Sequence, residues 1–560
     1  MHLRANGTQG HTDWHSLNWR KTNRIVRNLR QRIFRATTEG NLKKVRSLQK
    51  LMLRCYSNRL QSVRRVTLQN RGRYTPGVDQ VVIKTPEARG KLVDQLASYT
   101  PWKAHPARRV YIPKANGKQR PLGIATITDR CLQAVVKNAL EPEWEARFEC
   151  SSYGFRPGRS PHDAIEKIFR LSVPRTRKKW VLDADIRSCF DQISQPYLLE
   201  TIGRFPAREL IRQWLKAGYM EAGHWHPTDA GTPQGSVVSP LLANITLHGM
   251  EAALGVKYRS LQGGVILQSK RAIVRFADDF AVFCETQEDA EVSQQILDEW
   301  MKVRGLTLST EKTRIVHLSE GFDFLGFNIR QYPVPHTRTG WKLLIKPSKK
   351  SVQTIRNKLR QIWLDHLGKP IDVLLKKLNP IIRGQANYFR TGVSSRIFQK
   401  LDSWIYQRAK RFVKRTHPNK SDHWRVDKYW GRYNFDRPTD RWVFGSKQTG
   451  SYLLKYRWFP IKRHTLVKGY SSPDDPNLRD YWRQREQAKV KTELIPSRQK
   501  IAKRQDYVCP VCGETLLNEE ALQLHHKQPR AQGGDDSYGN LQLLHLYCHQ
   551  QVHSGTVRGS

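Results

Sequence analysis

The run Ile273-Val274-Arg275-Phe276-Ala277-Asp278-Asp279-Phe280-Ala281-Val282-Phe283 sets two adjacent aspartates between two apolar stretches. Its alternating and β-branched residues favour two short strands, so Asp278 and Asp279 are expected at the tip of a hairpin. Neighbouring carboxylates repel each other, and a divalent cation removes that repulsion. A third aspartate, Asp185, ends another apolar run, and two metal ions about 3.5–4 Å apart need shared carboxylates. The three aspartates predict a nucleotidyl-transfer site, whereas an isolated pair would indicate only a turn.

Further motifs accompany the aspartates in a fixed order along the chain. They occupy residues 109–114 (RVYIPK), 117–122 (GKQRPL), 152–160 (SYGFRPGRS), 231–242 (GTPQGSVVSPLL), 305–313 (GLTLSTEKT) and 324–327 (FLGF). In this order they resemble the motifs of the reverse transcriptases encoded by group II introns, over roughly residues 60–330. The resemblance implies an RNA-directed DNA polymerase that consumes deoxynucleotide triphosphates.

The composition predicts a nucleic-acid partner. The chain has 97 lysines and arginines against 49 acidic residues, which gives a net charge of +48, and such an excess needs a polyanion nearby. A membrane partner is not expected, because there is no apolar run of about 18 or more residues and no apolar leader after Met1-His2-Leu3-Arg4. We expect a cytoplasmic bacterial protein that associates with the nucleoid when it acts on DNA.

Length and pattern predict an α+β protein of several domains, since 560 residues exceed one core. The expected division is a basic helical extension at 1–60, polymerase fingers and palm at 61–335, a helical thumb at 336–445, a basic connector at 446–505 and a small module at 506–560. Helical spacing marks the first segment at Ile25, Leu29 and Ile33, and at Leu48, Leu51 and Met52. The resemblance implies that this extension grips template RNA; a plain amphipathic subdomain is the alternative. Two prolines in residues 331–336 predict a joint before the thumb.

Three amphipathic helices are expected in the thumb, from apolar spacing. Their apolar positions are Ile355, Leu359 and Ile362; Ile371, Leu374, Leu375 and Leu378; and Phe398, Leu401 and Ile405. Residues 378–389 (LNPIIRGQANYF) resemble the maturase domain X that follows the polymerase in intron proteins. Basic residues interleaved with aromatics follow and suit RNA binding, with a solvated helix face as the alternative. Position and charge alone suggest that the connector binds DNA.

The resemblance also implies roles for individual polymerase residues. Asp185, Asp278 and Asp279 would hold two Mg²⁺ ions. Residues implied to contact the incoming nucleotide or its pyrophosphate are Lys114, Arg120, Phe190, Gln234 and Lys312. Phe190 matches the bulky residue that excludes a 2′ hydroxyl, although a core aromatic is the alternative. Phe276 stands where the family usually has tyrosine, so the ring remains without its hydroxyl.

The carboxyl end contains two Cys/His pairs with equal internal spacing. Cys509 and Cys512 form the first pair, and His545 and Cys548 form the second. Thiolates with an imidazole predict a closed tetrahedral zinc site of structural type. The five other cysteines are scattered and read as reduced core thiols, namely Cys55, Cys131, Cys150, Cys189 and Cys284.

Around these pairs, roughly residues 505–555 resemble the HNH nuclease module that some group II intron proteins carry, a zinc-bound ββα-metal unit. The resemblance implies that His526 is the general base and that Asn540 orients it. It also implies that His525 and His549 hold a divalent catalytic cation; His553 is a further candidate, because residues i and i+4 share a helix face. His545 replaces a cysteine that is more common in the family. A zinc knuckle that only binds DNA is the alternative.

Taken together, the sequence predicts a group II intron-encoded protein with reverse transcriptase, maturase and HNH endonuclease activities. It would bind its intron RNA as a ribonucleoprotein, assist splicing, nick target double-stranded DNA and copy the intron from the new 3′ end. A retron-like reverse transcriptase is one alternative. A maturase that only assists splicing is another, but such proteins usually lose polymerase residues, and all three aspartates are present.

Overall fold

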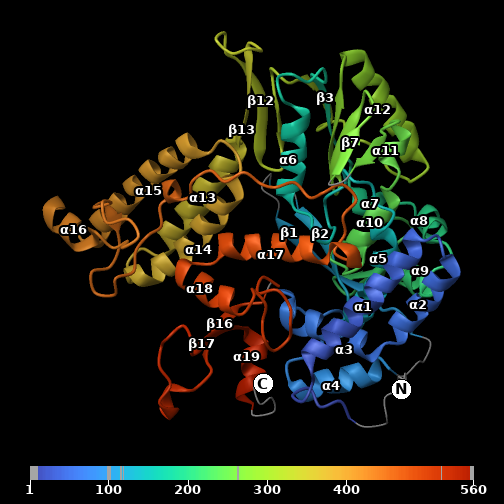
Figure 1. The fold of residues 1–560 in the computed structure, drawn as a ribbon, viewed down its shortest axis with the longest axis horizontal. Helices are drawn as coiled ribbons and strands as arrows, with labels where there is room; N and C mark the ends of the chain where they lie inside the picture. Colours follow the sequence, from blue (N-terminus) through green and yellow to red (C-terminus); the bar gives the residue numbers. More distant parts are fainter. Residues whose placement is uncertain are drawn as a thin grey trace.

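The computed structural model describes residues 11–97, 102–113, 117, 119–261, 264–518 and 520–554. Figure 1 shows a mixed molecule, with a sheet region, a helical arm and helices and short strands from both ends of the chain. The expected combination of helices and strands in several domains is confirmed. Among the described residues, no helix is both long and apolar enough to cross a membrane.

The central sheet has four antiparallel strands in the order β10-β3-β9-β8. They are β3 (Trp180–Asp185), β8 (Ala272–Phe276), β9 (Asp279–Cys284) and β10 (Arg314–His317). Side chains alternate along a strand, so Val282 joins one hydrophobic core while its neighbour Ala281 joins another. Helix α12 (Gln287–Lys302) contributes to the first core and α6 (Pro161–Leu171) to the second. Both faces of the sheet are therefore covered.

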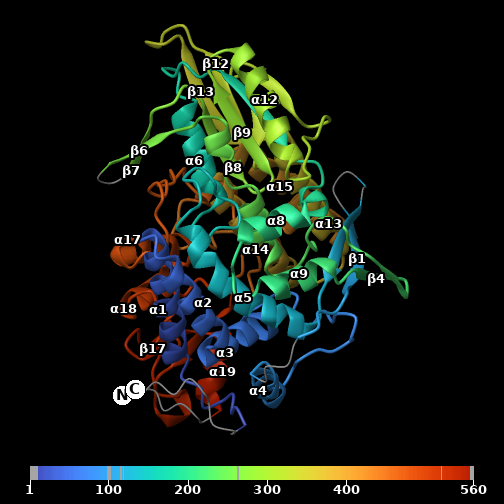
Figure 2. The ribbon, with the colours of Figure 1, turned by 90° about the vertical axis from the view of Figure 1, so that its right-hand side faces the viewer.

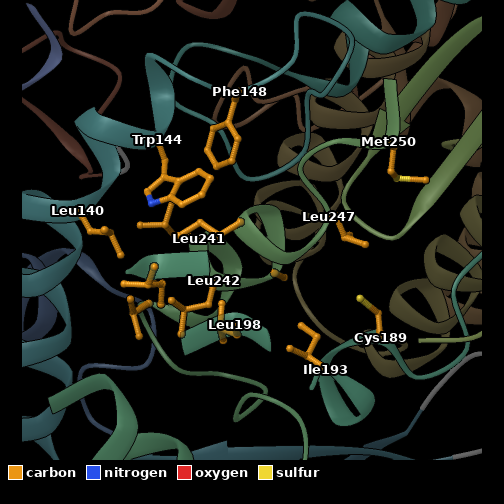
Figure 3. Close-up of a cluster of buried hydrophobic side chains, with 14 of the residues drawn as sticks. Leu140, Trp144, Phe148, Cys189, Ile193, Leu198, Leu241, Leu242, Leu247 and Met250 are labelled. Atoms are coloured by element: carbon orange, nitrogen blue, oxygen red, sulfur yellow. The ribbon is translucent and has the colours of Figure 1, made fainter. Parts of the chain in front are cut away.

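Short helices surround the first core. They are α5 (Ile127–Glu145), α7 (Cys189–Gln192), α8 (Gln195–Ile202), α9 (Arg208–Lys216), α10 (Ser239–Thr246) and α11 (Met250–Ala253). Figure 3 shows side chains from four of them, α5, α7, α8 and α10, converging with Met250 of α11 nearby. This core packs against the sheet through Leu182 and Val282, so it supports the strands that carry the aspartates.

A second sheet has the strand order β2-β1-β4-β5. Its strands are β1 (Ala107–Pro113), β2 (Gln119–Ile124), β4 (Tyr219–Glu221) and β5 (His224–His226). A separate hairpin consists of β6 (Tyr258–Leu261) and β7 (Gly264–Leu267). The strands β1 and β2 lie within residues 61–335, for which fingers and palm are expected.

The predicted joint at residues 331–336 is wrong, because part of this segment lies in a sheet. Residues 331–333 belong to β12 (Phe327–Pro333), the middle strand between β11 (Phe322–Phe324) and β13 (Trp341–Pro347). The prolines are tolerated because β11 pairs only as far as Ile329, and Pro333 is the last residue of β12. The predicted boundary at 335/336 consequently falls inside a hairpin.

The three predicted thumb helices are confirmed. They are α13 (Lys349–Asp365), α14 (Ile371–Phe389) and α15 (Ser395–Thr416), and they are followed by α16 (Asp422–Tyr429), β14 (Trp430–Gly431) and β15 (Val443–Phe444). Their apolar stripes join the second core, which continues to the central sheet through Phe327 and Val181. The helical arm is therefore packed on the sheet rather than held by a linker (Figure 1).

The connector crosses the surface of the sheet region before its own helices begin. It contains the short turns η2 (Tyr456–Trp458) and η3 (Pro476–Leu478), then α17 (Arg479–Glu493) and α18 (Pro496–Arg504). Asp163, at the start of α6, accepts hydrogen bonds from the Val467 backbone at 2.8 Å and from Arg485 at 3.2 Å. Trp482 of α17 is buried in the second core. The connector is thus fixed to the sheet region.

Both ends of the chain contribute to a third core. The N-terminal part has α1 (Trp19–Thr38), α2 (Leu42–Arg54), α3 (Tyr56–Arg64), the π-helical turn η1 (Arg65–Gln69) and α4 (Pro86–Gln95); the C-terminal part has β16 (Leu522–His526), η4 (Arg530–Gln532), β17 (Leu541–His545) and α19 (Leu546–His553). Of the N-terminal helices, α2 and most of α1 pack in the first core instead. Leu60 and Val63 of α3 share this core with Leu543 and Leu544 of β17. Figures 1 and 2 show the red C-terminal module against the blue helices.

Polar contacts reinforce this junction. Arg20 donates to the Pro510 carbonyl at 2.9 Å, and Asn23 donates to the Cys512 carbonyl at 3.1 Å. Most helical positions predicted for residues 1–60 are buried, but Leu51 is 42% exposed. The C-terminal module is therefore part of the same packed unit as the N-terminal helices, not a free appendage.

We predict that a chain ending at Arg504 melts at a lower temperature than the full chain and aggregates more readily. Removing β17 and α19 would expose Leu60 and Val63, now 1% and 0% exposed, and each such side chain loses about 1.5–3 kcal/mol of burial. Calorimetry and light scattering on both chains test this. Equal melting temperatures would contradict the shared core.

Candidate active sites

The predicted aspartate hairpin is confirmed. Strands β8 and β9 are joined at Ala277, whose φ of +59° makes the tight turn, and Asp278 follows in that turn. In the register of β3 with β9, Asp185 lies directly opposite Asp279. Strand pairing therefore brings the three carboxylates to one end of the central sheet, as the sequence indicated.

The charges at this end of the sheet are unbalanced. Burial raises the pKa of Asp279 to about 7, and the neighbouring charges of Asp278 and Asp185 raise it further in the same direction. Burial also raises the pKa of Asp278, with Asp185 adding to the effect. Lys312 forms an ion pair with Asp185, and this bond raises the pKa of the lysine. Clustered carboxylate oxygens with uncompensated repulsion are the donor set that Mg²⁺ prefers.

The residues predicted to surround the nucleotide come together next to the aspartates. Phe190 lies in α7, and its ring is 6.1 Å from that of Phe155 in a T-shaped arrangement. Gln234 donates to Asp191, the residue after Phe190, at 3.0 Å. Arg120 on β2 is close enough to Asp278 to lower its pKa against the effect of burial. Lys114 lies outside the described residues.

Sequence reasoning missed Phe155 and the buried support of the turn. Phe155 is 47% exposed with φ +59°, and it was quoted only as part of a motif. Arg275 is fully buried, and its guanidinium donates to Asn244 Oδ1 at 3.0 Å and to the Ala277 carbonyl at 3.3 Å. Asn244 in turn donates to the Gly154 carbonyl at 2.8 Å. These buried contacts fix the backbone of the aspartate turn and of the neighbouring Gly154.

The Cys/His pairs form one buried group. The ligand atoms of Cys509, Cys512, His545 and Cys548 all lie within 4.8 Å of one another. His545 Nδ1 is 3.3 Å from Cys512 Sγ, and its Nε2 is 3.1 Å from the Thr515 carbonyl. A carbonyl on the second ring nitrogen fixes the tautomer that binds metal through the first. Three thiolates and one imidazole in a closed site fit zinc.

One contact to this group comes from the other end of the chain. Arg64 of α3 donates to Cys548 Sγ at 3.2 Å and to Glu520 Oε1 at 3.0 Å, and it is 4% exposed. Its guanidinium stacks over the Trp19 ring at 4.6 Å. A buried cation beside several thiolates offsets their negative charge. No local motif could have revealed this partner.

The predicted histidine cluster is also present. Ligand atoms of His525, His549 and His553 lie within 4.8 Å of one another, with His525 on β16 and the other two one turn apart on α19. Burial lowers the pKa of His525 to about 4, and the two neighbouring histidines lower it further. The His525 ring is therefore neutral near pH 7, and a neutral imidazole is the form that binds a divalent cation.

The structure changes the expected role of Asn540. Its side chain accepts from the Gln528 backbone at 2.8 Å and donates to the Gln528 and Asp535 carbonyls, so it closes the loop after β16. None of these three bonds goes to His526. Instead, His526 Nε2 lies 2.7 Å from Asp536 Oδ1. Sequence reasoning had not selected Asp536.

The basic surface is divided between paired and mutually repelling groups. In the connector, Arg485 pairs with Asp163 and Arg483 pairs with Asp506. On the thumb, burial and the nearby charges of three other arginines lower the pKa of Arg408; they are Arg360, Arg411 and Arg415. A concentration of like charge on α13 and α15 suits a phosphate backbone. Part of the connector charge predicted for DNA is used within the molecule.

Comparisons with known families assign four segments of the chain. Residues 112–329 match reverse transcriptase (RNA-dependent DNA polymerase), and residues 14–96 match the N-terminal domain of reverse transcriptase. Residues 352–430 match the group II intron maturase-specific domain. Residues 509–555 match HNH endonuclease.

Individual relatives agree with these assignments. Protein YkfC of Escherichia coli (strain K12) is 37% identical over 304 residues, which cover 47% of this chain and 78% of YkfC. Group II intron-encoded protein LtrA of Lactococcus lactis subsp. cremoris is 31% identical over 358 residues, covering 53% of this chain and 59% of LtrA. The uncharacterized 91 kDa protein in the cob intron of Schizosaccharomyces pombe is 30% identical, and 43% of it is covered. The chain thus spans less than two thirds of the last two.

We predict that Gly154→Ala impairs primer extension about 10²-fold. An added Cβ would lie 2.3 Å from the Ala277 backbone nitrogen, which forces the aspartate turn to move, and a shift near 1 Å in catalytic groups has an effect of this size. Gly384→Ala is the matched control, since nothing lies within 4 Å of its added Cβ. That helical variant should extend normally and gain about 0.5–1 kcal/mol in stability. Equal rates for both variants would contradict the contact.

Proposed function

Because this chain belongs to the group II intron-encoded proteins, we propose that it combines reverse transcription, splicing assistance and DNA nicking to mobilise an intron. The observation that carries the proposal is the presence of two sites of different chemistry in one basic chain. One is the carboxylate turn, and the other is the histidine cluster beside a cysteine-rich group. The partners are the intron RNA, the double-stranded DNA target and deoxynucleotide triphosphates.

In the polymerase reaction, Asp185, Asp278 and Asp279 would hold two Mg²⁺ ions. When bound, these ions supply activation of the primer 3′ oxygen and neutralisation of charge on the pyrophosphate. The 3′ oxygen forms a bond to the α-phosphorus as the bond to pyrophosphate breaks. Lys312, which pairs with Asp185, would give charge or a proton to the leaving group.

Selection of the nucleotide is assigned to the residues around α7. Phe190 would lie under the sugar and clash with a 2′ hydroxyl, with Phe155 supporting its ring. Gln234 would line the pocket while its bond to Asp191 fixes the loop. Arg120 would contact the triphosphate from β2, together with Lys114.

In the nuclease reaction, His526 would act as general base on a water molecule. The water proton passes to the ring as the oxygen bonds to phosphorus. The P–O3′ bond breaks, and the leaving 3′ oxygen takes a proton from solvent. His525, His549 and His553 would hold the cation, which when bound supplies charge stabilisation at the phosphate. The product is a 3′ hydroxyl, which the polymerase site can extend along the intron RNA. Zinc at the Cys/His group would have a structural role.

RNA binding and splicing assistance are assigned to the thumb and the N-terminal helices. The arginines around Arg408 on α13 and α15 offer phosphate contacts. The net charge of +48 supports a large RNA partner. The carboxylate turn argues against a chain that only assists splicing.

We predict that Asp279→Asn abolishes extension of a DNA primer on an RNA template without weakening RNA binding. The change removes a metal ligand and makes the protein more cationic. Asp229→Asn is the control, because it makes the same charge change on a side chain that is 90% exposed. Gel extension and filter binding measure the two properties. Normal extension by the Asp279 variant would refute the polymerase assignment.

We also predict that His526→Ala and Cys509→Ser fail in different ways. The first should lower nicking about 10²–10⁴-fold, as for a lost general base, with zinc content and primer extension unchanged. The second should release zinc and destabilise the third core, because Cys509 is a fully buried ligand in it. The assay uses the full chain with the intron RNA that flanks its reading frame, and a duplex labelled on each strand that spans the ligated exons. If the His526→Ala protein nicks at the wild-type rate, the C-terminal module is better explained as a zinc knuckle that only binds DNA.

A further inference from the structure

The nuclease module contains an acidic residue that the proposed reaction does not use. Asp536 Oδ1 lies 2.7 Å from Nε2 of His526. The Arg530 guanidinium donates hydrogen bonds to the same carboxylate, from Nη2 to Oδ1 at 2.7 Å and to Oδ2 at 2.5 Å. The three side chains form a chain from guanidinium to carboxylate to imidazole.

The local fold explains how residues ten positions apart meet. Strand β16 ends at His526, and the chain turns through η4 and Gly533, whose φ is +79°. Asn540 closes this loop through the Gln528 backbone and the Asp535 carbonyl. The closed loop returns Asp536 to the ring of His526. Asn540 thus has an indirect part in placing the carboxylate.

We propose that Asp536 is a positioning residue that holds His526 in the tautomer and orientation needed for a general base, and that Arg530 holds Asp536 in place. This inference rests on the proposed nuclease function. If Nε2–H donates to Asp536, the lone pair is on Nδ1. Nδ1 then accepts the water proton, and the adjacent carboxylate stabilises the imidazolium that forms.

The same contacts could be an ordinary surface ion pair, and the two interpretations predict different behaviour. The Asp536 side chain is 62% exposed, and exposed pairs contribute little to stability. Loss of the carboxylate should therefore leave the fold intact. An effect on nicking would have to pass through the His526 ring, because Asp536 is bonded to that ring and to Arg530.

The test compares Asp536→Asn with Asp535→Asn in the full-chain ribonucleoprotein on the labelled exon-junction duplex. Both changes remove one negative charge, but Asp535 Oδ1 accepts from Ser537 and not from the base. We expect Asp536→Asn to lower the single-turnover nicking rate about 10–100-fold, the usual effect of losing a group that orients a histidine. DNA affinity, zinc content and primer extension should stay unchanged. Asp535→Asn should nick as the wild type does.

A double variant separates positioning from a structural role. In a His526→Ala background there is no ring to orient, so adding Asp536→Asn should cause no further loss, as for residues that act as one unit. The slow rates are followed with protein in excess over DNA.

Three results would overturn the proposal: a wild-type rate for Asp536→Asn, loss of zinc from that variant, or an equal loss in the His526→Ala background. Wild-type nicking by His526→Ala alone would instead refute the nuclease assignment itself.

Discussion

Antiparallel pairing of β3 with β9 forces Asp185 and Asp279 to lie side by side, and much of the fold serves to hold these like charges together. Helices on both faces of the sheet prevent the strands from separating. Behind the turn, the buried Arg275 and Asn244 hold the Ala277 and Gly154 backbones. Burial, and then repulsion from Asp278 and Asp185, raises the pKa of Asp279. A divalent cation would offset this repulsion.

The third core joins the two ends of the chain. Helices matched to a reverse transcriptase N-terminal domain pack against the segment matched to HNH endonuclease, and Arg64 reaches from one to the thiolate group of the other. Protein cores are tightly packed and have low compressibility, so they transmit strain. Movement of either segment should therefore displace the other. The two matched segments therefore form one packed unit.

Basic residues in different parts of the chain differ in how far their charge is neutralised by partners within the molecule. The connector bonds several of its basic residues to acidic or carbonyl groups within the molecule, for example Arg485 to Asp163 and Arg463 to Thr391. The thumb helices α13 and α15 instead gather arginines near Arg408 that repel one another. These arginines on α13 and α15 keep more of their charge available for phosphate than the paired residues of the connector do.

What the sequence by itself determined was local. Residue order and short spacings predicted the aspartate hairpin, the three helices after residue 336 and the Cys/His group, because each depends on strand alternation, helical period or ligands close in the chain. The histidine cluster was expected from the resemblance to HNH nucleases, and spacing added only His553 to it. Only the tertiary structure decided that Arg64 meets Cys548 across 484 positions, that Asn540 closes a loop while Asp536 contacts His526, and that residues 331–333 are strand. These contacts depend on loop closure and long-range packing, which leave no periodic signal in one sequence.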